Sequence, residues 1–251
     1  MMADAVANTP DCVLFFESLQ HRYSEQNRDY SVCFASEARH EFHAHDIIVL
    51  YGHSGSGKST LLNLLGGLDC PAAGNLQVWW DVGSRPQNMS VPRDNRGLAH
   101  YRRRKISFLF QDGGLIEELD VLQNVMLPLR YASIPRNERR ARCEQALERV
   151  GLKDMTNKSV SQLSGGERHR VGLARVIARQ AEIVICDEPT AALDQATSEL
   201  VRDILMGESR RGACIFIATH DPVLIDDDFA DRFIHIKNGE AIVQHRLSTE
   251  R

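Results

Sequence analysis

A short glycine-rich segment limits most strongly what this chain can fold into. Residues 52–59 read GHSGSGKS, which fits the pattern G-x-x-x-x-G-K-[ST]. An apolar run of strand length precedes the segment, and leucines at helical spacing follow it over 61–68. Glycines let backbone N–H groups turn toward phosphate oxygens, and the start of a helix adds partial positive charge. The segment therefore predicts an α/β fold that binds a nucleoside triphosphate.

The loop is expected to contact both the phosphates and a metal ion. Lys58 can reach the β- and γ-phosphates, and the Ser59 hydroxyl can ligate Mg²⁺. The residues assigned to the nucleotide are Gly52, His53, Ser54, Gly55, Ser56, Gly57, Lys58, Ser59 and Thr60.

The rest of the hydrophobic pattern is typical of an α/β protein. Near-continuous apolar runs of strand length occupy residues 46–51, 105–110, 183–186 and 213–218. Such runs indicate parallel strands that are covered on both faces. Helical stripes lie between them, so the sequence predicts a parallel-sheet core with a small antiparallel β-region in one domain spanning 1–251.

Three stretches outside these runs complete the predicted architecture. Residues 232–237 and 240–245 flank an Asn-Gly pair, which favours a terminal β-hairpin. The span from about 115 to 180 lacks a good strand pattern and is predicted to be a helical insert. Residues 84–97 are polar and rich in Pro, Asn and Arg, which predicts a surface loop.

A carboxylate pair follows the apolar run at 183–186. Burial beside that run is costly for Asp187 and Glu188 unless a metal ion or a water molecule uses their charge. We therefore expect Asp187 to hold Mg²⁺ and Glu188 to act as general base toward the attacking water.

Four predicted strands each end close to a residue that suits a phosphate site. Open α/β sheets bind ligands outside the carboxyl ends of their strands. We therefore expect four residues from four strands to lie around one crevice, namely Gly52, Gln111, Asp187 and His220.

A second phosphate-binding surface is predicted at residues 163–168, which read LSGGER. Ser164 and Glu167 have the spacing of a capping box at a helix start. Gly165 and Gly166 would leave the amides of that helix end bare. Two phosphate surfaces far apart in one sequence suggest that two chains meet over shared nucleotides.

Taken in order, these segments and the Ala192-Leu193-Asp194 stretch resemble the ATP-binding subunits of ABC transporters over about residues 12–245. The resemblance implies an ABC-type P-loop NTPase core. Three segments look most like the branch of lipoprotein-release and macrolide-export ATPases, namely 61–69, 124–129 and 163–168.

The resemblance also implies roles for single residues in a head-to-tail dimer. Residues Ser164, Gly165, Gly166 and Glu167 of one chain would close on the γ-phosphate held by the other chain. His220 would contact the γ-phosphate, and Asp194 would link the two sites. Gln111 would sense Mg²⁺ by acting as one of its ligands. It would also sense the membrane partner.

An aromatic side chain is expected to stack on adenine. Tyr23 is the candidate and Tyr30 the alternative, with a simple packing role open for either. Three positions depart from the family pattern without removing a residue needed for hydrolysis: Glu167, His169 and the 112–114 stretch.

Composition and short motifs argue against other ligands. Lys and Arg number 30 against 34 Asp and Glu, so the net charge of −4 gives no reason to expect nucleic acid. The basic run at 101–105 is interpreted as a solvated face before the next strand. His40, His43 and His45 have no Cys or acidic group in a ligand pattern, so we do not expect a metal site there.

The expected location follows from what the sequence lacks. Its six cysteines include no C-x-x-C pair, which indicates reduced thiols in a cytosolic protein. No apolar run approaches ~18 residues, and the first residues do not resemble a signal peptide. We expect a cytoplasmic ATPase whose partners are a second copy and a membrane permease that holds it at the inner face of the cytoplasmic membrane.

Alternatives remain open at this point. A soluble ABC ATPase acting on DNA or ribosomes would usually carry tandem domains, coiled-coil arms or zinc inserts. A signalling or cell-division scaffold would not need Glu188 and His220 to activate water. A P-loop kinase would leave residues 163–167 without a role. The transported substrate and the direction of transport are not assigned.

Overall fold

The structure, a computed structural model, describes all residues except 1–11, 26–27, 34–38, 72, 83–84, 92–93, 112, 133, 192, 238–239 and 246–251. For parts of 17–39 and 73–90 it describes the backbone alone.

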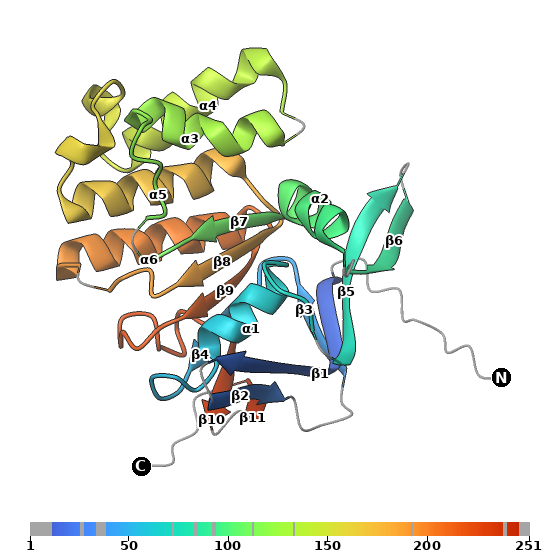
Figure 1. Ribbon diagram of the computed structural model, residues 1–251. Helices are drawn as coiled ribbons and strands as arrows, with labels where there is room; N and C mark the ends of the chain where they lie inside the picture. The colour runs from blue at the N-terminus through green and yellow to red at the C-terminus, as the bar shows by residue number, and fades with distance from the viewer. Residues whose placement is uncertain are drawn as a thin grey trace.

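Within the described residues one 11-stranded sheet organises the chain, in the order β6-β5-β1-β2-β11-β10-β4-β9-β8-β7, with β3 paired to β1 (Figure 1). Its parallel half contains β4 (Ile47–Tyr51), β7 (Ile106–Leu109), β8 (Ile183–Asp187), β9 (Cys214–Ala218) and β10 (Arg232–Lys237). The antiparallel pairings involve β1 (Cys12–Glu25), β2 (Arg28–Cys33), β3 (Arg39–His43), β5 (Ala73–Val82), β6 (Arg85–Ser90) and β11 (Glu240–Gln244). The predicted α/β class is confirmed.

The parallel strands are buried on both faces, which explains their near-continuous apolar sequences. In β4, Ile47 and Val49 belong to one core cluster, whereas Ile48 and Leu50 belong to the other. The second cluster also takes its leucines from α1 (Lys58–Leu65) and Tyr101 from α2 (Asn95–Lys105). Alternate side chains of a strand point to opposite faces, so a strand covered twice needs apolar residues throughout.

The first core cluster is covered by helices that lie together in Figure 1. They are α3 (Val121–Tyr131), α4 (Arg136–Arg149), α5 (Gly165–Arg179) and α6 (Gln195–Arg210), with short 3₁₀ turns η1 (Lys153–Met155) and η2 (Val160–Gln162). Asp120, Ser164 and Asp194 cap the starts of α3, α5 and α6. Helices α3, α4 and α5 lie within the predicted helical insert at about 115–180, and α6 lies after it. The two boundaries of the insert stay a prediction.

One sequence-based prediction about the 84–105 stretch is wrong, and another holds in part. The polar residues over 84–97 do not form a loop, because Arg85–Ser90 is strand β6 and α2 begins at Asn95. Strand β6 ends the sheet order, and an edge strand tolerates polar residues and proline. The basic run is the last turn of α2 and leads into β7, with Arg103 and Arg104 exposed as expected but both ends of the run buried. Its Tyr101 is fully buried and donates a hydrogen bond to the carbonyl oxygen of Leu65 (2.8 Å).

The terminal hairpin is present as β10 and β11, although its Asn238-Gly239 turn lies outside the described residues. Among the described helices, none has the combined length and hydropathy of a membrane-spanning segment.

Candidate nucleotide-binding site

The loop after β4 depends on glycine for its conformation. Gly52, Gly55 and Gly57 have φ angles of 150°, 74° and 109°, a region that disfavours other residues. A Cβ atom at Gly52 would lie 2.2 Å from the carbonyl oxygen of Ile236, so the loop packs directly against β10. Gly57 is the N-cap of α1, which places the start of that helix at the end of the loop.

Lys58 lies over this loop and contacts its backbone. Its Nζ donates to the carbonyl oxygens of Gly52 (2.9 Å) and His53 (3.1 Å), and the side chain is mostly buried. Burial lowers the pKa of Lys58, while Glu188 and Asp187 act in the opposite direction by charge attraction. The ammonium group is thus held beside the loop, where it can bind phosphate oxygens.

Glu188 and His220 complete a contact chain with Lys58. Strands β8 and β9 are neighbours, with Asp187 opposite Ala218, so the residues that follow them meet at one sheet edge. The Nε2 atom of His220 lies 3.1 Å from Lys58 Nζ and 3.5 Å from Glu188 Oε1. The backbone N–H of His220 also donates to Glu188 Oε2 (3.3 Å). Glu188 has a φ of 47°, and such rare conformations of a non-glycine residue concentrate at functional sites.

The oxygen donors predicted for Mg²⁺ lie around the same edge. Asp187 ends β8, Ser59 is exposed in the first turn of α1, and Gln111 is exposed two residues after β7. Carboxylate, hydroxyl and amide oxygens are the ligands that Mg²⁺ prefers, so this donor set fits the ion. Asp187 also lies close enough to Lys58 to act against the burial that lowers the pKa of that lysine.

The helix start predicted as a second phosphate surface has no polar contact with the loop among the described residues. The capping box forms, since Glu167 Oε2 accepts from Ser164 N (2.7 Å) and Ser164 Oγ accepts from Glu167 N (3.3 Å). The hydrogen bond from the Ser164 backbone lowers the pKa of Glu167. Asp194 accepts from Thr197 N (2.8 Å), and hydrogen bonds from the Thr197 backbone and side chain lower the pKa of Asp194. In the described part of the chain, neither group makes a hydrogen bond or ion pair with the 52–59 loop.

The glycines of this surface have no packing reason within the chain. A Cβ atom at Gly165 would meet nothing within 4 Å, and one at Gly166 only the end of Arg170 at 3.9 Å. Glycine in a helix is destabilising by roughly 0.5–1 kcal/mol relative to alanine. The two glycines therefore leave the backbone amides of this helix start uncovered by side chains of their own.

The adenine-stacking candidates lie outside the described side chains. Tyr23 and Tyr30 are register partners in the β1–β2 pair, which is all that the structure describes of them. In the phosphate loop, Ser56 Oγ is buried and makes no hydrogen bond to the described residues.

His169 is a residue to which the sequence analysis gave no role. It is 3% exposed on the inner face of α5, and backbone groups of Gln111 and Pro189 lie against its ring. Burial lowers the pKa of His169, and these two backbone groups act in the opposite direction. Neither ring nitrogen makes a well-formed hydrogen bond, so the ring packs between the two segments. Its position on the buried stripe of α5 is the signal that could have found it.

Comparison with known families assigns this arrangement. Residues 36–191 match the family model described as ABC transporter. The chain belongs to the ABC transporter family. It is an ATPase of that family. Its nucleotide-binding loop at 52–59 and its second glycine segment at 163–168 both lie inside the matched region.

Relatives of this ABC transporter chain include fused and stand-alone proteins. It is 39% identical over 200 residues to "Macrolide export ATP-binding/permease protein MacB 2" of Yersinia pestis bv. Antiqua (strain Antiqua), covering 80% of this chain but 28% of that protein. It is 38% identical over 204 residues to the "Uncharacterized ABC transporter ATP-binding protein YvrO" of Bacillus subtilis (strain 168), covering 81% of this chain and 85% of YvrO. The chain therefore spans less than a third of MacB 2.

A solved cassette has the same fold. The "ATP-binding cassette MJ0796 bound to ADP and Pi" superposes with a TM-score of 0.76 at 30% identity, covering 94% of this chain and 99% of that one. Its structure is described as dimeric and post-hydrolysis. The expected family, fold class and ATPase activity are thus confirmed.

Proposed function

We propose that two copies of this ABC ATPase close over two Mg·ATP and that hydrolysis drives an export-type membrane permease. The observation that carries the proposal is the separation of two phosphate surfaces in one chain. Among the described residues, no hydrogen bond or ion pair joins the 52–59 loop to the start of α5, and a Cβ atom at Gly165 would meet nothing within 4 Å. The dimeric MJ0796 cassette supports the same arrangement.

Each residue of the loop-side surface has a role in this scheme. The backbone of 52–60 and Lys58 bind the phosphates, and Ser59, Asp187 and Gln111 hold Mg²⁺. When bound, Mg²⁺ neutralises charge on the β- and γ-phosphates. Tyr23 or Tyr30 stacks on adenine.

Hydrolysis uses the Glu188–His220 pair. Glu188 accepts the proton of the attacking water as the water oxygen bonds to the γ-phosphorus. The bond from that phosphorus to the bridging oxygen breaks and leaves ADP and phosphate. His220, held 3.5 Å from Glu188 Oε1, donates to the γ-phosphate. From the other chain, Ser164, Gly165, Gly166 and Glu167 cover the same phosphate, and Asp194 connects the two sites.

A basic and apolar groove suits the permease. A cavity of about 330 Å³ opens beside the Gln111 segment between the end of α2 and the end of α3. Its apolar lining includes Leu68, Phe110 and Tyr131, which are 44%, 37% and 66% exposed. Arginines from α2 and α5 line the same cavity. This chemistry fits an apolar permease segment that carries acidic side chains.

The groove is also connected to the nucleotide site. Phe110 directly precedes Gln111, and Arg175 donates to the carbonyl oxygens of Gly113 (2.6 Å) and Gly114 (2.7 Å). A segment bound in the groove would therefore contact Phe110, the residue directly before Gln111. The fusion of a permease to the cassette in MacB 2 supports export, and a permease would keep the chain at the inner face of the membrane. The intact Glu188–His220 pair favours turnover over a scaffold role.

Affinity capture from detergent-solubilised membranes tests this proposal. A Glu188→Gln chain with ATP should recover a multi-spanning membrane protein in stoichiometric amount. A Glu188→Gln/Tyr131→Glu chain should lose that protein and keep ATP-driven dimerisation. Recovery of soluble partners alone, or equal recovery by both chains, would contradict the permease assignment.

A further inference from the structure

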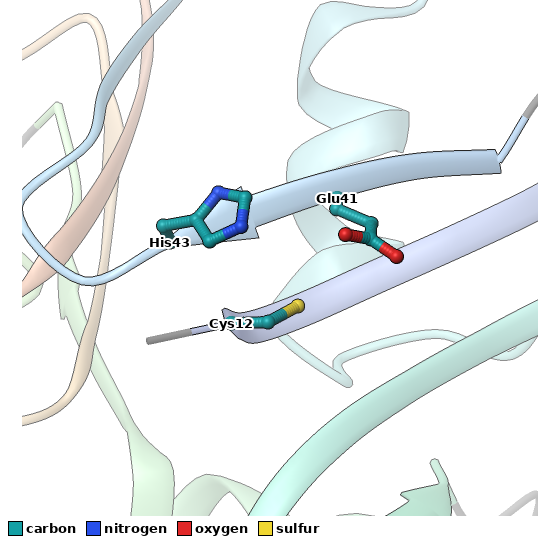
Figure 2. A group of neighbouring side chains, drawn as sticks. All are labelled: Cys12, Glu41 and His43. Atoms are coloured by element: carbon teal, nitrogen blue, oxygen red, sulfur yellow. The ribbon is translucent and has the colours of Figure 1, made fainter. Parts of the chain in front are cut away.

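We propose that Cys12, Glu41 and His43 form a zinc-binding site at the β1–β3 pair, separate from the nucleotide site (Figure 2). One ligand atom from each of the three residues lies within 4.8 Å of the others. Figure 2 shows the sulfur, the carboxylate and the far nitrogen of the imidazole ring directed toward the same space between the strands.

A register shift between the strands gathers these side chains. Strand β1 pairs Leu14 with Phe42, but it pairs Cys12 with His43 because of an irregularity between Cys12 and Leu14. In a regular ladder, Cys12 and Leu14 would share the core face. The extra residue in β1 places Cys12 opposite His43 instead. Glu41 is two residues before His43 in β3, so its side chain lies on the same face as His43. Bulges of this kind re-aim a side chain.

The three donors suit Zn²⁺ in type and charge. Thiolate, imidazole and carboxylate bind this ion at about 2.3, 2.0 and 2.1 Å, with tetrahedral geometry. Those bond lengths place neighbouring ligand atoms about 3.5 Å apart, so the cluster needs to close by about 1 Å. The thiolate and the carboxylate together balance a dication, and water can occupy the fourth position.

A second layer of contacts orients the imidazole. Asp46 Oδ2 lies 3.7 Å from His43 Nδ1 and accepts a hydrogen bond from the His43 backbone N–H (2.8 Å). The Nδ1 side of the ring is thus occupied and the Nε2 side faces Cys12 and Glu41. A carboxylate behind a ligating histidine is the usual second layer of a zinc site.

The arginine nearest to this cluster is paired with a carboxylate. Arg232 lies 3.4 Å from His43 Nδ1, but its guanidinium group pairs with Asp46 (3.3 Å). It also donates to the backbone carbonyl of Glu41. The Asp46 carboxylate therefore balances part of the arginine charge.

From the sequence we expect no metal among His40, His43 and His45. Cys12 is far from these histidines in the sequence, so the pairing of β1 with β3 is needed to bring its thiol to them. Only His43 of that set belongs to the cluster. A bound ion would fasten the beginning of β1 to β3.

Metal binding by the full-length, metal-free chain tests this site. Zn²⁺ is titrated against a chromophoric chelator without nucleotide and with Mg²⁺ in excess, so the ATP site does not contribute. We expect one Zn²⁺ per chain, and Co²⁺ should give the charge-transfer band of a cobalt–thiolate bond. Cys12→Ser and His43→Gln should each weaken Zn²⁺ binding by about 100-fold or more, and Asp46→Asn by about 10-fold.

Matched controls keep the result interpretable. Cys70→Ser and His100→Gln replace the same residue types elsewhere and should leave Zn²⁺ affinity unchanged. The ATPase rate of each variant reports whether it folds. Cys12→Ser or His43→Gln chains that hydrolyse ATP and bind Zn²⁺ as tightly as the unmodified chain would overturn the proposal. So would a Co²⁺ complex without the thiolate band.

Discussion

Replacing Gly52 by alanine should destabilise the chain much more than the same change at Gly55. Both glycines have positive φ angles in one loop, 150° and 74°. A Cβ atom at Gly52 would lie 2.2 Å from the Ile236 carbonyl oxygen, whereas one at Gly55 would meet nothing within 4 Å. Gly55→Ala therefore adds backbone strain alone, and Gly52→Ala adds strain and a collision with β10.

The expected sizes follow from these two terms. Backbone strain of this kind costs about 1–3 kcal/mol, and overpacking costs about 1–3 kcal/mol more. We expect Gly52→Ala to lower the free energy of unfolding by about 4 kcal/mol and Gly55→Ala by about 1.5 kcal/mol. With a urea m-value of about 3 kcal/mol/M, the midpoints should fall by about 1.3 M and about 0.5 M.

Urea unfolding of the nucleotide-free chains, followed by circular dichroism, measures this difference. Equal midpoints for the two variants would refute the argument, because they would mean that the loop does not press on β10. A larger loss for Gly55→Ala would refute it as well.

Three further predictions concern α5. A Cβ atom at Gly165 would have open space around it, so Gly165→Ala should raise the free energy of unfolding by roughly 0.5–1 kcal/mol. The same change should lower the ATPase rate. A thermal melt measures the first effect and a phosphate-release assay the second. The pKa of Glu167 is lowered in the folded chain, so its charged form stabilises the fold fully at a pH above the ordinary carboxyl pKa of 4.5. This stabilisation is lost as the pH falls through the lowered pKa. The stability difference between the unmodified chain and Glu167→Gln should therefore shrink in acid, and a pH-independent difference in urea midpoints would contradict this. His169→Ala removes the ring between the Gln111 and Pro189 segments, so kcat should fall by about 10-fold or more with little change in KM for ATP, whereas His169→Gln should restore much of the rate. A pure loss of stability with unchanged kcat would exclude this positioning role.

The parallel core could be predicted because its pattern depends on burial alone. Residues 47–50 are apolar without a break, and the structure covers them on both faces. Strand β6 could not be predicted in the same way. Its sequence RPQNMS is polar, and only its pairing with β5 makes it a strand.

The candidate site shows the same division. The contacts among Lys58, Glu188 and His220 follow from neighbouring strands that end at one edge, which the sequence pattern already implies. The packing of His169 depends on how α5 docks against two loops, and the Cys12–His43 pairing depends on a register shift. The register has no local sequence signal, and the buried stripe of α5 marks His169 as buried without showing which loops its ring meets.

Sedimentation velocity of the Glu188→Gln chain tests most directly whether two chains share their nucleotides. With Mg·ATP the account predicts a dimer, and with Mg·ADP a monomer. A Glu188→Gln/Gly165→Glu chain should stay monomeric with ATP. Its added carboxylate has room at the helix start and suits that end of the helix, but it would repel the other chain's phosphate. A Glu188→Gln chain that binds ATP by calorimetry and remains a monomer would contradict the account.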